Sequence, residues 1–103
     1  MYHIYGKSKT VDRTFESLLR DLEETEKKKL MTTLAKAPKG LPPNLRSSEN
    51  FGRVEKKNKR FWQYYLDSSG WRVIYEVIDR PKQVIIQFIG DHEDAGAFLR
   101  QNG

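Results

Sequence analysis

Cysteine is absent from this chain of 103 residues. Its absence excludes a disulfide framework and any site in which a thiolate binds a metal or acts as a nucleophile. The chain also lacks an apolar run of about 20 residues, the length that spans a bilayer. Its first residues, MYHIYGKSK, have no apolar centre of the kind found in signal peptides. We therefore expect a cytoplasmic protein without a membrane partner.

Metal-binding patterns, phosphate-binding loops and nucleophile elbows are missing as well. We accordingly expect no metal and no small-molecule cofactor. His3 has no ligand pattern near it and is expected to be an ordinary strand residue.

The chain is rich in aromatic side chains and in positive charge. Aromatic residues make up 12% and hydrophobic residues 37% of the sequence, which is too much for a disordered chain. The length suits a single domain, residues 1–103, with one modest core. Nineteen Lys and Arg against fourteen Asp and Glu give a net charge of +5. This balance favours a polyanionic partner such as RNA, DNA or an acidic protein.

The order of apolar patterns predicts a small α+β domain. Residues 2–5 (YHIY) are β-prone and predict a first strand. Residues 11–38 carry apolar side chains at helical spacing on both sides of the polar segment 23–26, which predicts an antiparallel helical hairpin. Residues 40–50 (GLPPNLRSSEN) are rich in turn formers and predict an ordered surface loop.

Three runs of β-branched and aromatic residues follow. RFWQYYL, WRVIYEVI and QVIIQFI, separated by DSSG and DRPK, predict a three-stranded antiparallel meander. If each separator is a four-residue loop, Leu66 pairs with Trp71 and Ile78 pairs with Gln83. The last segment, DHEDAGAFLRQNG, has Asp91 as a helix N-cap and predicts a short terminal helix.

This register gives the predicted sheet two unlike faces. One is uncharged and is expected to form the core beneath the helices: Trp62, Tyr64, Leu66, Trp71, Val73, Tyr75, Val77, Val84, Ile86 and Phe88. The other is mixed: Phe61, Gln63, Tyr65, Arg72, Ile74, Glu76, Ile78, Gln83, Ile85, Gln87 and Ile89. Mixed faces bind partners, which here would be the C-terminal segment, another chain or a substrate.

Arg72 is the residue of the mixed face that most needs an explanation. The register places it opposite Tyr65, with Ile89 or Gln87 on its other side. An arginine in this position is an ion-pair partner of Glu76, a solvated side chain, or a fixed positive charge in a binding site.

A basic segment and a histidine are further candidates. Residues 53–62 (RVEKKNKRFW) have two interpretations. Their basic side chains could bind nucleic-acid phosphates while a base stacks on an aromatic ring, or they could form a lysine-rich strand edge that resists aggregation. His92 is predicted at the start of the terminal helix, at the end of the strand beside Arg72. Histidine can titrate near neutral pH, which suits an acid or base.

Four motifs follow one another along the chain: YHIYGKSK, LPPNL, SSGWRVIYEV and IGDHEDAGAFL. With the order strand, helical hairpin, proline-rich loop and meander, they resemble the RelE/ParE superfamily of bacterial toxins from toxin–antitoxin pairs. The resemblance covers essentially the whole chain, and GWRVIYEV followed by IG and a histidine-containing turn is its most specific part. It implies a microbial RNase-like fold and, for the RelE branch, cleavage of mRNA in the ribosomal A site.

The resemblance also implies roles for single residues. Arg72 matches the family's strand arginine, which binds the scissile phosphate. His92 falls where relatives carry Arg or His and would act as general acid or phosphate ligand. Phe98 falls where an aromatic residue stacks on or orients the substrate, and Trp62 would be a second stacking group.

Two positions depart from the family pattern. Gln63 and Tyr65, which we still expect to contact the substrate, stand where well-studied RelE toxins have two lysines. Their loss should cripple the lysine-based mechanism unless His92 carries the chemistry, as in the histidine-using relatives. Positive charge from Lys57, Lys59 or Arg60 would then supply part of the electrostatics.

Two functions are therefore compatible with the sequence. The first is a metal-independent, ribosome-dependent mRNA endonuclease that inhibits translation, with the ribosome and mRNA as partners. The second is a non-catalytic ParE-like toxin that poisons a protein such as DNA gyrase, or an inactivated RelE relative that only binds. Either implies a cognate antitoxin whose acidic segment neutralises the basic protein.

Overall fold

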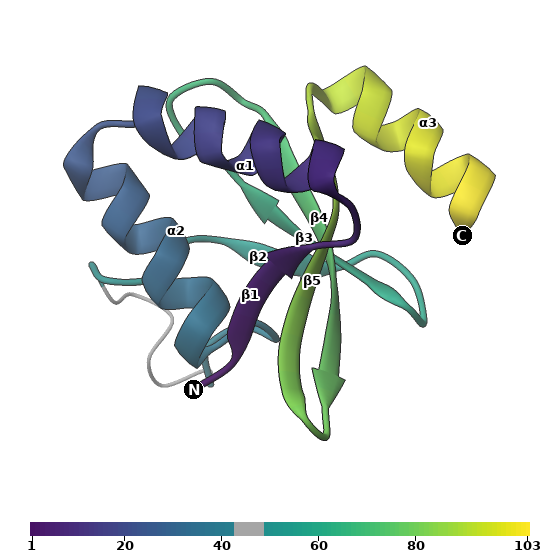
Figure 1. Cartoon of the computed structure of the whole chain (residues 1–103), viewed down its shortest axis with the longest axis horizontal. Helices are drawn as coiled ribbons and strands as arrows, with labels where there is room; N and C mark the ends of the chain where they lie inside the picture. Colours follow the sequence, from purple (N-terminus) through teal and green to yellow (C-terminus); the bar gives the residue numbers. More distant parts are fainter. Residues whose placement is uncertain (43–48) are drawn as a thin grey trace.

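In a computed structural model, which describes residues 1–42 and 49–103, five strands form one mixed sheet (Figure 1). Its order is β1-β5-β4-β3-β2. The strands are β1 (His3–Gly6), β2 (Val54–Lys56), β3 (Phe61–Tyr65), β4 (Arg72–Asp79) and β5 (Lys82–Gly90). The α+β class is confirmed.

The predicted meander of β3, β4 and β5 is present with the expected loops. Tyr65 pairs with Arg72, and Ile78 pairs with Gln83. Two further pairings complete the sheet: β1 runs parallel to β5 at one edge, and β2 runs antiparallel to β3 at the other. β2 lies inside the basic segment at the edge of the sheet, which agrees with the interpretation of this segment as a lysine-rich strand edge, although the bounds of the strand were not predicted.

Three helices accompany the sheet: α1 (Lys9–Asp21), α2 (Glu24–Lys36) and α3 (His92–Asn102). α1 and α2 form the predicted helical hairpin, and α3 is the predicted terminal helix. Asp91 caps α3, because its side chain accepts a hydrogen bond from the Asp94 N–H at 2.8 Å. The predicted surface loop, residues 40–50, falls largely on residues 43–48, which lie outside the described residues. No helix in the described ranges is long and apolar enough to cross a membrane.

The main core lies between the helical hairpin and one face of the sheet (Figure 1). Its buried members are Phe15, Leu30, Leu34, Tyr64, Leu66, Val73, Tyr75, Val84 and Ile86. The Tyr75 hydroxyl donates a hydrogen bond to the Pro38 carbonyl, so this buried polar group is satisfied and ties the end of the hairpin to β4. Burial raises the pKa of Tyr75 and keeps it neutral.

A β-bulge in β5 places two of its side chains on the faces opposite to those predicted. The register shifts by one residue between Ile74 and Tyr75, so that Ile74 pairs with Phe88 whereas Tyr75 pairs with Ile86. Phe88 therefore joins the side of the sheet away from the hairpin, and Ile89 packs on the main core. Both had been expected on the opposite faces, because simple alternation leaves no place for the extra residue.

Because of the same bulge, the neighbour of Arg72 on β5 differs from the predicted one. Its partner on β5 is Gly90, and the expected neighbour Ile89 pairs with Val73 instead. Trp71, expected in the core, is 42% exposed, because it precedes the first residue of β4.

The second face of the sheet is partly covered by α3. Phe61, Ile74 and Ala95 form a small buried cluster there, and Phe88, Phe98 and Leu99 pack against it. Of the partners considered for the mixed face, the C-terminal segment thus covers one part. The rest of this face stays open to other partners.

Leu34→Ala tests the packing of the hairpin on the sheet. Leu34 is fully buried, so the cavity left by the substitution should lower the free energy of unfolding by about 2–5 kcal/mol, measured by urea denaturation. Lys36→Ala, an exposed change on the same helix, should stay within about 0.5 kcal/mol of the wild type. Equal effects of the two substitutions would contradict this core.

Candidate functional site

Three side chains from neighbouring strands meet on the sheet face that the hairpin leaves open. Tyr65 on β3 pairs with Arg72 on β4, and its N–H donates to the carbonyl of Arg53, which precedes β2, at 3.1 Å. The guanidinium carbons of Arg53 and Arg72 lie 4.2 and 4.4 Å from the centre of the Tyr65 ring. Both distances fit cation–π contacts, worth about 0.5–1 kcal/mol each at exposed sites. One neutral ring therefore holds two fixed positive charges close together.

The segment before β2 is positioned by contacts with the core. The Gly52 N–H donates to Thr33 Oγ1 on α2 at 2.8 Å. A side chain at Gly52 would meet the Tyr64 hydroxyl, since a Cβ there would lie 2.1 Å from that oxygen. The chain therefore passes close against buried groups at Gly52 and places Arg53 beside Tyr65.

Arg72 makes few polar contacts of its own. Its Nη1 donates to the Gly70 carbonyl in the preceding turn, and its Nε is shielded from solvent without a partner among the described residues. The alternative of an ion pair with Glu76 is wrong, because the Glu76 carboxylate accepts from Arg60 Nε at 3.0 Å instead. Arg72 thus carries its charge on this face without a carboxylate partner in the described part of the chain.

Glu55 on β2 is the carboxylate of this cluster. It accepts a hydrogen bond from the Tyr65 hydroxyl at 2.7 Å, and its nearest approaches to Lys57 Nζ and Arg53 Nη2 are 3.4 and 3.8 Å. The hydrogen bond from Tyr65, followed by the charge of Lys57, holds the pKa of Glu55 below its usual range. Glu55 is therefore ionised at neutral pH.

The basic hairpin between β2 and β3 is built around Asn58. Its side-chain oxygen accepts from the N–H groups of Arg60 at 2.9 Å and Phe61 at 2.7 Å, which closes the turn. Lys57 and Arg60 are engaged with acidic side chains, as described above, whereas Lys59 is exposed at the tip. Of the three predicted basic contacts, Lys59 is thus the most freely presented.

Trp62 is not brought together with Arg72. It pairs with Tyr75 and packs against the main core, so its side chain lies on the hairpin side of the sheet. Lys56 Nζ lies 5.7 Å from the centre of its ring. Gln63 shares the face of Arg72 but is only 4% exposed. A ligand on this face therefore meets Tyr65 more readily than Gln63 or Trp62.

His92 and Phe98 both lie on α3. His92 is the first residue of the helix and is exposed, two residues after Gly90, the partner of Arg72. Phe98 packs against Phe61 and Phe88, with ring centres 5.5 and 5.4 Å apart, and so fastens α3 to the sheet. The contact of His92 or Phe98 with a substrate stays a prediction.

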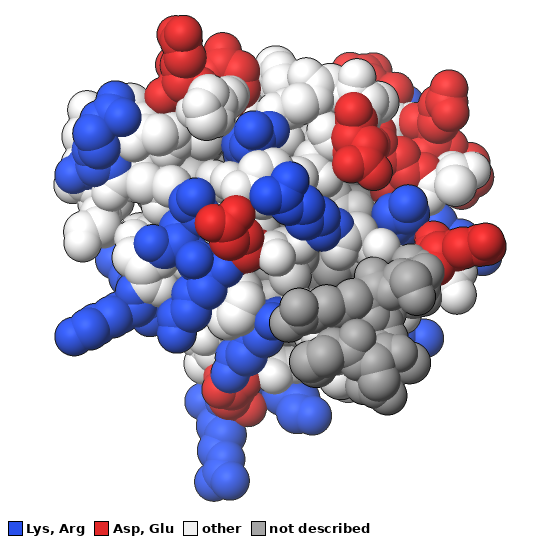
Figure 2. Space-filling model, turned by 180° about the vertical axis from the view of Figure 1, so that it is seen from behind, with Lys and Arg blue, Asp and Glu red and all other residues white. Residues whose placement is uncertain are grey.

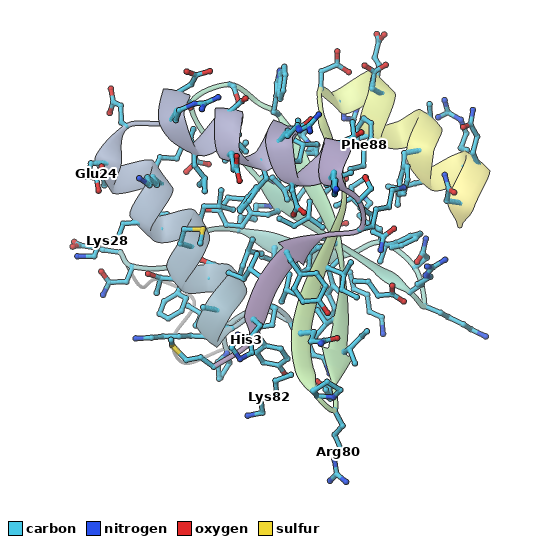
Figure 3. All side chains as sticks on the ribbon, viewed as in Figure 1. His3, Glu24, Lys28, Arg80, Lys82 and Phe88 are labelled. Carbon is cyan, nitrogen blue, oxygen red and sulfur yellow. The ribbon has the colours of Figure 1, made fainter. Side chains whose placement is uncertain are left out.

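His3 lies at the other end of β5, where it pairs with Gln83. Figure 3 shows it near Lys82, far from Phe88, while Arg80 projects from the tip of the β4–β5 hairpin. Among the described residues no group of three or more acidic or histidine side chains could hold a metal.

Basic side chains are numerous on the side of the molecule that is seen from behind the view of Figure 1. Figure 2 shows Lys and Arg side chains in the middle and lower part of this side, whereas acidic side chains crowd its upper margin. We define the candidate site as Arg53, Glu55, Tyr65, Arg72 and His92, which the pairing of β2, β3 and β4 and the start of α3 after β5 bring to one region of the sheet.

Arg53 and Glu55 were not singled out from the sequence. The sequence feature that could have identified them is the alternation of Arg53, Glu55 and Lys57. In a strand, this alternation puts three charged side chains on one face. Because β2 is short and charged, its pattern alone resembles a loop.

Comparison of the sequence with models of known protein families finds no match, and comparison with curated proteins finds no significant match.

Tyr65→Phe tests the hydrogen bond at the centre of the site. The substitution keeps the ring but removes the donor that contributes most to the lowered pKa of Glu55, so this pKa should rise toward its ordinary value of 4.5. An NMR titration of the side-chain carboxyl groups measures the change. An unchanged Glu55 titration in Tyr65→Phe would show that the hydroxyl does not bind the carboxylate.

Proposed function

We propose that the protein is the toxin of a toxin–antitoxin pair and cuts mRNA on the ribosome. The observation that carries this proposal is the position of Arg72. Its guanidinium is held by Tyr65 and the Gly70 carbonyl on an open sheet face, with no carboxylate partner among the described residues. A guanidinium stays protonated at any working pH, so the face keeps a charge suited to a phosphate.

The proposed reaction is attack of a ribose 2′-hydroxyl on the neighbouring phosphorus. The O2′–P bond forms, the P–O5′ bond breaks, and the products are a 2′,3′-cyclic phosphate and a 5′-hydroxyl. Arg72 stabilises the charge that develops on the non-bridging phosphate oxygens. Glu55, which is ionised beside Tyr65, accepts the proton of the 2′-hydroxyl. His92 gives a proton to the leaving O5′.

Several partners follow from this proposal. The basic hairpin with Lys57, Lys59 and Arg60 would contact ribosomal RNA, and Phe98 would lie against the substrate near the start of α3. The cognate antitoxin would cover the basic side with an acidic segment. The protein would act in the cytoplasm, without a metal or small-molecule cofactor.

A second candidate is supported by the two positions where RelE toxins have lysines. Gln63 is buried and Tyr65 is uncharged and engaged with Glu55, so neither provides a cationic acid–base group. A ParE-like toxin that poisons a protein such as gyrase, or a relative that only binds, needs no such group.

Arg72→Ala separates these functions. In a reconstituted translation system with a defined mRNA, the wild type should produce new RNA ends at A-site codons, mapped by primer extension. Arg72→Ala should lower this cleavage about 100-fold or more, because a charged donor to the developing anion is lost. Arg13→Ala, an exposed arginine on α1, is the matched control and should cut like the wild type. Intact RNA with wild-type protein that still arrests growth would favour the second candidate.

His92→Gln tests the general acid. We expect cleavage to fall about 100-fold or more, and to be restored when the scissile O5′ is replaced by sulfur, since a thiolate leaves without a proton. Equal losses on the oxygen and sulfur substrates would mean that His92 acts by binding and not as an acid.

A further inference from the structure

We propose that Arg53 and Arg72 bind two successive phosphates of single-stranded RNA as a guanidinium pair spaced by the ring of Tyr65. This inference rests on the proposed function, from which the ligand is taken to be RNA. It assigns a binding role to Arg53, and it makes Tyr65 a positioning residue in place of a direct substrate contact.

The geometry of the pair carries the proposal. Each guanidinium carbon lies within 4.4 Å of the same ring centre, so the two cannot be more than twice that distance apart. The backbone supports this arrangement, because the Tyr65 N–H donates to the Arg53 carbonyl and Tyr65 pairs with Arg72. The two cations thus lie on either side of β3, one on β4 and one just before β2, and share the Tyr65 ring as a neutral spacer.

The local charge favours an anion. Arg53, Lys57 and Arg72 stand against the single carboxylate of Glu55 in this cluster. The approach of Arg53 to Glu55 is long, at 3.8 Å, and the side chain of Arg53 is 70% exposed. Exposed ion pairs of this kind are weak, so a phosphate can compete with Glu55 for Arg53.

The pair also accounts for the missing lysines. Tyr65 stands where RelE toxins have a lysine, and it cannot supply charge there. Its ring instead orders two guanidinium groups, whose planar forks suit phosphate oxygens and also stack on aromatic rings. A lysine at position 53 would keep the charge but lose both properties.

Binding to an RNA that cannot be cleaved tests the pair. The probe is a fluorescein-labelled hexanucleotide with 2′-O-methyl groups throughout, and fluorescence anisotropy gives its Kd at several salt concentrations. Arg53→Ala should weaken binding about 10-fold and reduce the slope of log Kd against log salt by about 0.7, the value for one phosphate contact on a single strand. Arg72→Ala should do the same. Arg13→Ala is the matched control and should leave both quantities unchanged.

Substitutions at the spacer and at position 53 test the geometry. Tyr65→Phe keeps the ring and should keep the affinity, whereas Tyr65→Leu removes it and should weaken binding several-fold. Arg53→Lys should retain the salt slope but bind more weakly than the wild type. Thermal unfolding of each variant, compared with the wild type, shows whether it is folded. If Tyr65→Leu is unfolded, the comparison of Arg53→Ala with Arg13→Ala decides alone.

The outcomes separate this inference from the proposed function. Weakened binding in Arg53→Ala and Arg72→Ala, with no cleavage of mRNA by the wild type, would support the pair and overturn the nuclease. Cleavage by the wild type, with Arg53→Ala binding RNA like Arg13→Ala, would overturn the pair and leave the nuclease standing. A wild-type protein that does not bind the hexanucleotide at low salt would also overturn the pair.

Discussion

The alternation of side chains along β4 places Arg72 on the open face of the sheet. Val73 and Tyr75 are fully buried beneath the helical hairpin, and Ile74 is fully buried beneath α3. A slip of one residue in the pairing with β3 would turn Arg72 toward the hairpin core, where an unpaired charge costs several kcal/mol. The core therefore fixes the register, and the register fixes the site.

Much of this arrangement could be predicted from the sequence because it follows from local patterns. The two turns of the meander, the helical hairpin and the cap at Asp91 each have signals within a few residues. The bulge in β5 has no such signal, so simple alternation put Phe88 and Ile89 on the wrong faces. The parallel pairing of β1 with β5 joins segments about 80 residues apart, and no local pattern specifies it.

The sequence predicted some residues of the candidate site but not all of them. Arg72 opposite Tyr65 followed from the turn length, and the position of His92 at the start of α3, just after the strand that pairs with β4, followed from the end of the meander. Arg53 and Glu55 did not follow, because β2 is a three-residue strand that gains its structure from pairing with β3. Assigning a residue to a face does not show whether it can reach a ligand. Gln63 lies on the face of Arg72 but is buried, and Trp62 packs against the main core on the other face.

We propose that one face of the sheet is a binding surface for a polyanion, with Arg53 and Arg72 at its centre. The most direct test is an NMR titration that follows the side-chain Nε–Hε signals of both arginines while the uncleavable hexanucleotide is added. We predict that both signals shift and saturate at the same RNA concentration, while the signal of Arg13 on α1 stays in place. Shifts confined to groups on the helices, with Arg53 and Arg72 unchanged, would contradict the account.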